Sequence, residues 1–233
     1  MRRALALALA GALLGAPALA ADAPVQVPDT LAQRLQPCMA CHGAQGRASR
    51  EGYLPRIAGK PAGYLYNQLL HFREGRRANA AMTALLDTLS DAYLREIAGH
   101  FAALDLPYPP PPPAAWPAAT LARGRALVES GDPSRGIPAC TACHGSTLMG
   151  ALPATPGLLG LPRDYLLGQL GAWRTGQRRA LAPDCMARVV ETLNADDIGA
   201  LVAWLATQAP PAGAGPVAPS GGPLPMDCGS AVR

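Results

Sequence analysis

Apolar side chains recur at helical spacing in several stretches of this chain. Residues 64–73 place apolar and aromatic side chains near every third or fourth position, and Gly75 follows them as a helix stop signal. Residues 91–103 and 120–130 show the same spacing. No stretch alternates apolar and polar residues as a half-buried strand does. The pattern therefore predicts an all-α protein.

This helical pattern occurs twice. The segment Tyr-Leu-x-x-Gln-Leu that begins at Tyr64 recurs 101 residues later, at Tyr165. Further segments recur in the same order: residues 55–59, 72–75 and 91–103 have copies at 156–160, 173–176 and about 196–207. Because order and spacing are both kept, this is an internal repeat. It predicts one helical domain that has been duplicated.

A proline-rich segment separates the two copies. Residues 107–117 include five consecutive prolines, which favour polyproline II and make a semi-rigid spacer. A second Pro/Gly-rich segment, at 210–225, predicts an irregular tail. We therefore expect a signal segment at 1–20, a first domain at 21–106, a linker at 107–117, a second domain at 118–208 and a tail at 209–233.

The first residues are typical of an export signal. Met1-Arg2-Arg3 precedes an uncharged run rich in Ala and Leu, and Ala18-Leu19-Ala20 is a small-residue cleavage site. We expect cleavage after Ala20. The alternative is a retained membrane anchor, but the apolar run is marginal in length for spanning a bilayer. The mature chain is thus expected in the bacterial periplasm, an oxidising compartment in which disulfides form.

Composition and charge narrow the classes of function. The formal net charge is only +4, and no basic run is long enough to suggest a nucleic-acid partner. Aromatic residues are scarce, with 2 Phe and 3 Trp, and much of the apolar content is Ala. Two domains of this composition would have thin cores. A large apolar cofactor in each domain would supply the missing volume.

Each copy contains one Cys-x-x-Cys-His motif, at residues 38–42 and 140–144. This motif is the attachment signature of c-type haem. Positions i, i+3 and i+4 of a helix share a face, so two thiols can reach two vinyl groups of one haem while the His faces the iron. We expect two covalently bound haem c groups, attached through Cys38, Cys41, Cys140 and Cys143, with His42 and His144 as proximal iron ligands.

Two other interpretations of the motifs are weaker. A structural zinc site needs four ligands, and each copy has only one Cys-His cluster, with the two further His both in the first copy. A redox dithiol would be typical of a βαβ setting, which the helical pattern does not offer. An exported chain with two matching motifs favours haem.

A distal iron ligand has to come from further along each copy. Met82 lies 40 residues after His42, and Met186 lies 42 residues after His144. This matched placement favours the two methionines as ligands, and a thioether raises the reduction potential in a way that suits an electron carrier. Met39, Met149 and Met226 are poorly placed, and His71 and His100 have no His copy, so we expect ordinary roles for these five.

Two cysteines remain outside the motifs, Cys185 and Cys228. In an oxidising compartment a disulfide between them is favoured, which would tie the tail back near the second haem. The alternative is that Cys185, which immediately precedes Met186, is a thiolate ligand of that haem and lowers its potential. Spacing alone does not decide between the two.

With these features the sequence resembles class I cytochromes c, and as a tandem pair it is similar to the diheme cytochromes of the c-four type. The resemblance covers roughly residues 29–207. It implies two tandem class I cytochrome c domains joined by the Pro-rich linker. It also implies that the carbonyls of Pro55 and Pro156 accept the proximal imidazole N–H groups. It places Tyr64, Arg73, Tyr165 and Arg174 near the haem edges or propionates.

The function we expect is electron transfer between a respiratory donor and an acceptor, an oxidase or a reductase, by a carrier that is not itself an enzyme. Its partners would be redox proteins, with peripheral association with membrane complexes. One alternative is a haem subunit of a periplasmic dehydrogenase. Another is a diheme enzyme of the peroxidase or thiosulfate dehydrogenase type. Such an enzyme needs an open or displaceable sixth position on the iron, and Cys185 would have to provide it at the second haem.

Overall fold

The computed structural model describes residues 28–48, 52–113, 115–218 and 223–231. They fall into two compact units, with the boundary between Arg34 and Leu35. Among the described residues of the first unit, α1 (Leu31–Arg34) is a single helical turn. The predicted signal and its cleavage after Ala20 lie outside the described residues. Within the described ranges, no helix combines the length and the hydrophobicity needed to cross a bilayer.

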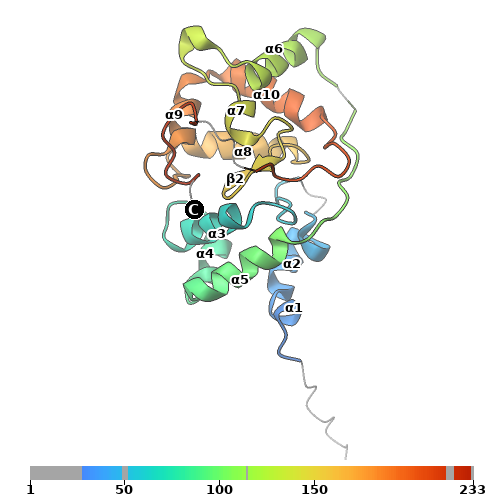
Figure 1. Ribbon diagram of the computed structural model, residues 1–233, viewed down its shortest axis with the longest axis vertical. Helices are drawn as coiled ribbons and strands as arrows, with labels where there is room; N and C mark the ends of the chain where they lie inside the picture. Colours follow the sequence, from blue (N-terminus) through green and yellow to red (C-terminus); the bar gives the residue numbers. More distant parts are fainter. Residues whose placement is uncertain (1–27, 49–51, 114, 219–222, 232–233) are drawn as a thin grey trace, which may run out of the picture. The chain divides into compact units, whose positions relative to one another are not determined.

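Apart from one two-stranded sheet, the regular secondary structure of the second unit is helical, which confirms the all-α prediction (Figure 1). The first copy holds α2 (Gln36–His42), the 3-10 turn η1 (Ala44–Gly46), α3 (Ala62–Arg73), α4 (Ala80–Leu86) and α5 (Asp91–Ala102). The second copy holds α6 (Ala118–Glu129), η2 (Pro133–Arg135), α7 (Thr141–His144), α8 (Arg163–Arg174), α9 (Cys185–Thr192) and α10 (Ala195–Thr207).

One short sheet departs from the sequence prediction. β1 (Gly150–Ala151) and β2 (Thr155–Pro156) pair antiparallel, whereas the sequence predicted no strand. Each strand has only two residues, which is too short for an alternation of apolar and polar residues to be recognised. The pair closes the loop that follows α7, and so shapes the chain directly after the second motif.

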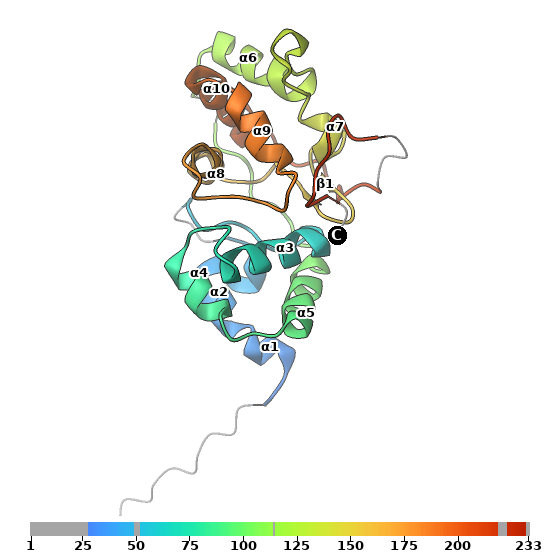
Figure 2. The ribbon, with the colours of Figure 1, turned by 90° about the vertical axis from the view of Figure 1, so that its left-hand side faces the viewer.

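The repeat in the sequence is a repeat of helices. α3 and α8 have equal length, and their bounds lie 101 residues apart. Both begin directly after a proline, Pro61 and Pro162, which is two residues earlier than the pattern predicted. α5 and α10 correspond as well, and each has a side-chain N-cap: Ser90 accepts from the Tyr93 amide at 3.2 Å and Asn194 from the Asp197 amide at 2.8 Å. Within each copy these helices pack together, α3 on α4 and α5, and α10 on α6 and α8 (Figures 1 and 2).

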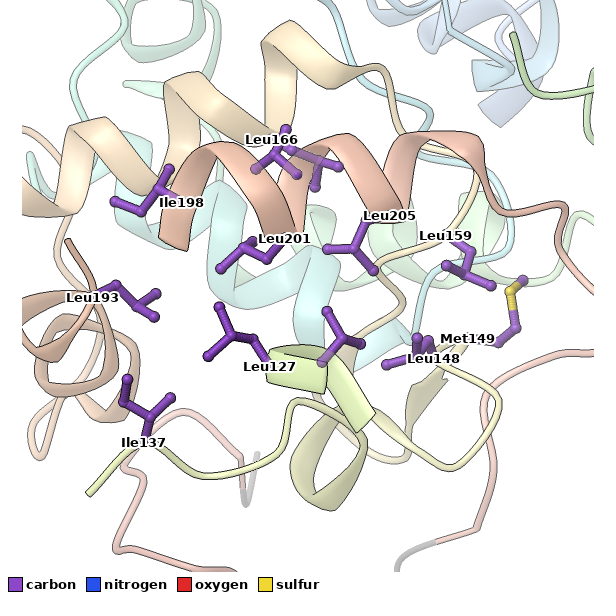
Figure 3. Close-up of a cluster of buried hydrophobic side chains, with 12 residues drawn as sticks. Leu127, Ile137, Leu148, Met149, Leu159, Leu166, Leu193, Ile198, Leu201 and Leu205 are labelled. Carbon is purple, nitrogen blue, oxygen red and sulfur yellow. The ribbon is translucent and has the colours of Figure 1, made fainter. Parts of the chain in front are cut away.

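The hydrophobic core of the second copy lies between α6, α8 and α10 (Figure 3). Leu127 of α6 faces Leu201 of α10 across it. Met149 belongs to this core and is 4% exposed, which is the ordinary core role expected of it. Gly124 lets α6 and α10 approach closely, since a Cβ there would lie 2.1 Å from the Ala200 carbonyl oxygen.

A buried carboxylate joins the same two helices. Asp197 in the first turn of α10 is fully buried, and it accepts hydrogen bonds from Arg123 of α6 at 2.5 Å and from Arg135 of η2 at 2.7 Å. Burial opposes the ionisation of Asp197, but the hydrogen bonds from Arg135 and Arg123 outweigh it and lower the pKa to about 2. The Asp197 carboxylate therefore stays charged, and its ion pairs hold α10 to α6 and to η2, the turn that precedes the second motif.

The tail is irregular, as predicted, and it is attached to the second copy at several points. Val217 pairs with β1 through its amide, which donates to the Gly150 carbonyl at 3.0 Å. Further on, Cys228 forms a disulfide with Cys185, with the Cα atoms 4.9 Å apart. The Ser230 carbonyl then accepts a hydrogen bond from Asn67 of α3 at 3.1 Å. The tail thus contacts the loop that follows α7 and the start of α9, and it also reaches the first copy.

Candidate metal centres

The first motif lies on α2. Cys38, Cys41 and His42 occupy positions i, i+3 and i+4 of this helix, so that all three face the same side, as the spacing predicted. His42 is 9% exposed, and its Nδ1–H donates to the Pro55 carbonyl at 2.9 Å. That bond leaves the other ring nitrogen, Nε2, as the one that can bind a metal.

The second motif repeats this geometry. Cys140 is the N-cap of α7, and Cys143 and His144 lie in its single turn. His144 is 7% exposed, and its Nδ1–H donates to the Pro156 carbonyl at 2.7 Å. The two proline carbonyls therefore act alike in the two copies, which is the contact that the resemblance implied.

The protonation properties of both motifs suit an iron ligand set. Burial lowers the pKa of His42 and of His144, so both imidazoles are neutral near pH 7 and keep a lone pair for a metal. Burial raises the pKa of Cys140 to about 11 and raises those of Cys38 and Cys143. A redox-active dithiol needs a lowered thiol pKa, so this shift disfavours that alternative.

The two candidate distal methionines occupy matching places. Met82 lies in the first turn of α4, where its amide donates to the N-cap Asn79 at 3.0 Å. Met186 lies in the first turn of α9, whose N-cap Asp184 accepts from the Ala187 amide at 3.0 Å. Both methionines are half-buried. The caps fix where each helix starts, and therefore where each thioether is presented.

The environment of Met186 differs from that of Met82 in one respect. The preceding residue, Cys185, is bonded to Cys228, so its sulfur is not a free thiolate. The tail reinforces this anchor, because the Gly229 amide donates to the Pro183 carbonyl at 3.0 Å. The start of α9 is thus held by a covalent link that α4 does not have.

The two copies meet along their repeated segments. Arg77 and Arg178, which are 101 residues apart, form an antiparallel β-bridge. On one side of it the Ala78 amide donates to the Gln177 carbonyl at 2.9 Å, and on the other the Arg179 amide donates to the Arg76 carbonyl at 2.7 Å. Corresponding residues therefore contact each other reciprocally, as in an interface with a local two-fold axis.

The side chains repeat this reciprocity. Arg77 donates to Gln68 of its own copy at 3.0 Å and to Gln169 of the other at 2.7 Å. Arg178 donates to Gln169 at 2.8 Å and to Gln68 at 3.2 Å. Arg77 also donates to the Tyr165 hydroxyl at 3.1 Å. All of these hydrogen-bond partners are neutral.

This interface carries a positive charge that the described protein groups do not neutralise. Arg77 and Arg178 are 9% and 6% exposed, and no ion pair within the described ranges includes either of them. Burial and the adjacent Arg77 lower the pKa of Arg178. Burial would raise the pKa of Tyr165, but Arg77 and Arg178 more than offset it and the pKa is lowered. Anionic groups placed here would be stabilised strongly, and haem propionates are of that kind.

The family resemblance did not point to this arginine pair, but to Arg73 and Arg174 as residues near the haem edges or propionates. Arg73 is instead paired with Asp91 at 2.5 Å, and Arg174 is exposed. The sequence did contain a signal for the arginine pair, because Gln68/Gln169 and Arg77/Arg178 all keep the offset of 101.

Of the remaining histidines, His71 is buried in α3 with its Nε2 unpartnered, and burial lowers its pKa to about 4.

Comparison with known proteins gives both a sequence relative and structural neighbours. No protein-family model matches the chain. A curated relative, the thiosulfate dehydrogenase electron acceptor of Thiomonas intermedia, is 37% identical over 210 residues, which cover 89% of this chain and 92% of the relative.

Two solved structures are similar to the fold. A reduced recombinant cytochrome c4 from Pseudomonas stutzeri is 31% identical with a TM-score of 0.64, covering 74% of this chain and 93% of that one. A thiosulfate dehydrogenase, TsdBA from Marichromatium purpuratum in its as-isolated form, is 37% identical with a TM-score of 0.65. In that case the match covers 73% of this chain but only 36% of the longer one.

Proposed function

Because the chain belongs to the cytochrome c4 family of diheme c-type electron carriers, we propose that it is the periplasmic electron acceptor of a thiosulfate dehydrogenase. The observation that carries the proposal is the 37% identity to such an acceptor over 92% of its length. In addition, a stretch similar to this chain makes up about a third of one thiosulfate dehydrogenase chain. As in its relatives, the chain acts as a carrier and not as the enzyme.

The proposed haem attachments follow the two motifs. Each haem is held by the two thiols of its motif as thioethers, Cys38 with Cys41 and Cys140 with Cys143. The proximal ligands are His42 and His144, and the distal ligands are Met82 and Met186. The proline carbonyls at 2.9 and 2.7 Å from the imidazoles support this, because they fix ring orientation and strengthen the nitrogen donors.

The unneutralised arginine pair supports the placement of the haem carboxylates. We propose that the propionates of both haems point toward Arg77 and Arg178 at the interface. Two buried guanidinium groups held by neutral glutamines are stable together only if anionic groups offset their charge. With their propionates there, the two haems would lie near enough to each other for electrons to pass between them.

When bound, haem c supplies a one-electron ferric/ferrous couple. The chain's own residues do the rest. His42 with Met82, and His144 with Met186, would supply the protein ligands of the two irons, and would leave no position open for substrate. The neutral imidazoles and the thioethers add no charge at the iron. In the second copy, the buried apolar side chains around α6 and α10 would keep water away from the haem, so that its surroundings would change little on reduction.

The family also indicates where the chain works, since its relatives are periplasmic or membrane-associated. We propose the periplasm for this chain, with residues 1–20 removed as the export signal. The partners are redox proteins: the dehydrogenase as donor, and a respiratory acceptor to which electrons are passed on.

The proposal is tested by reduction of the oxidised protein with thiosulfate. With a catalytic amount of a purified thiosulfate dehydrogenase, the haem absorption should change to the reduced spectrum. With thiosulfate alone it should stay oxidised, because both axial positions are filled. If dithionite reduces the protein but thiosulfate with active dehydrogenase does not, this pairing is wrong. Reduction by thiosulfate alone would favour the enzyme alternative instead.

A further inference from the structure

A buried lysine crosses from the first copy to the second. Lys60 lies just before α3 and is only 4% exposed. Its Nζ donates to the Gly157 carbonyl at 3.3 Å, and no ion pair in the described part of the chain involves Lys60. An ammonium group that is buried against a single carbonyl is costly, so its presence there calls for a reason.

The position of Lys60 is next to the second proximal histidine. Gly157 directly follows Pro156, whose carbonyl accepts the Nδ1–H of His144 at 2.7 Å. The Lys60 ammonium therefore binds the carbonyl that directly follows the one bonded to the His144 imidazole. Burial lowers the pKa of Lys60 to about 8, and nearby Arg56 acts in the same direction. Lys60 therefore still carries its positive charge near pH 7.

The repeat explains why the charge comes from the other copy. In the first copy, position 56 holds a buried arginine, whose Nε donates to the Ala58 carbonyl at 3.1 Å. The corresponding position in the second copy is Gly157. No side chain fits there, because a Cβ on Gly157 would lie 2.6 Å from the Met149 carbonyl carbon. Lys60 therefore supplies a cation to the loop at Pro156 and Gly157, which has no room for a cationic side chain at position 157. The residue that corresponds to Lys60 in the second copy is the uncharged Leu161.

We propose that Lys60 is a positioning residue that raises the reduction potential of the second haem from the opposite domain. Haem iron gains a positive charge on oxidation, and a buried cation nearby disfavours that form. Because Lys60 belongs to the first copy, the potential of the second haem depends on the two copies staying docked. This inference rests on the proposed haem attachment at His144 but not on the identity of the dehydrogenase.

The test is a spectroelectrochemical titration of the intact diheme protein, below the pKa of Lys60. In Lys60→Met, the potential of the second haem should fall while that of the first is unchanged, and Lys60→Arg should keep both near wild type. The second haem is identified as the step that moves in Met186→His. Arg125→Met is the matched control, since it removes one positive charge at an exposed site on α6 and should move neither step.

The proposal is overturned if Lys60→Met leaves both potentials where they were, or lowers both equally. If the methionine variant does not fold, Lys60→Gln gives the same test with a polar side chain. The titration uses no dehydrogenase, so a negative result here is distinguishable from a failure of the thiosulfate assay.

Discussion

Replacing Cys140 and Cys143 together by alanine is expected to leave one covalently bound haem in each chain instead of two. Both thiols lie on the side of α7 that His144 faces, and the second copy has no other cysteine pair for attachment, because Cys185 is bonded to Cys228. The first motif on α2 is separate and should be loaded normally. The mass of the denatured intact chain measures this directly, since only covalently attached haem remains.

The matched control removes the other cysteine pair. Cys185→Ser with Cys228→Ser should keep two haems, because the disulfide anchors the tail and holds no cofactor. Two haems in the Cys140/Cys143 variant, or one haem in the disulfide variant, would contradict the assignment.

Replacing Met186 by alanine is expected to remove the contribution of the second haem to the far-red sulfur-to-iron absorption band. It is also expected to lower the reduction potential of that haem. Axial ligands set haem potentials over a range of about 0.8 V, and loss of a thioether shifts the potential downward within it. The far-red absorption band of the oxidised protein, which reports methionine ligation, should fall to about half, and the same change is expected for Met82→Ala. Met149→Leu is the control, because Met149 is a core residue of the second copy. If Met149→Leu halves the band and Met186→Ala leaves it intact, the ligand assignment is wrong.

Much of this architecture could be predicted from the sequence because the determining signals are local or repeated. The spacing of apolar residues gave α3, α5, α6 and α10, and the offset of 101 related the two copies. The motif spacing placed each Cys-x-x-Cys-His group on one side of a helix. The short helices α4 and α9 gave no periodic pattern, and their starts are set by the single capping residues Asn79 and Asp184.

The contacts between the copies could not be predicted in this way. Arg77 and Arg178 each look like surface cations when read within one copy, and only the reciprocal pairing of the two copies buries them. Lys60 similarly gains its role from a carbonyl 97 residues away. The Cys185–Cys228 disulfide, in contrast, was favoured from the sequence because the compartment is oxidising, and the structure confirms it.

These interdomain contacts make the two centres unequal. The interface network is reciprocal, but the cation at the proximal loop differs, being Arg56 of the same copy in the first and Lys60 of the other copy in the second. Only the second methionine has a disulfide beside it. The proximal histidines are bonded alike, so a difference in potential between the haems would come from these asymmetric groups. Such a difference would give electrons a preferred direction between the two haems.

We propose that the chain is a diheme carrier with methionine-ligated iron at both sites. A reductive titration of the purified, fully oxidised protein tests it most directly, with the far-red band followed as electrons are added. We expect an uptake of two electrons per chain, in two steps, with the far-red band lost in proportion to the electrons added. Uptake of a single electron per chain, or a fully oxidised protein without the band, would contradict it.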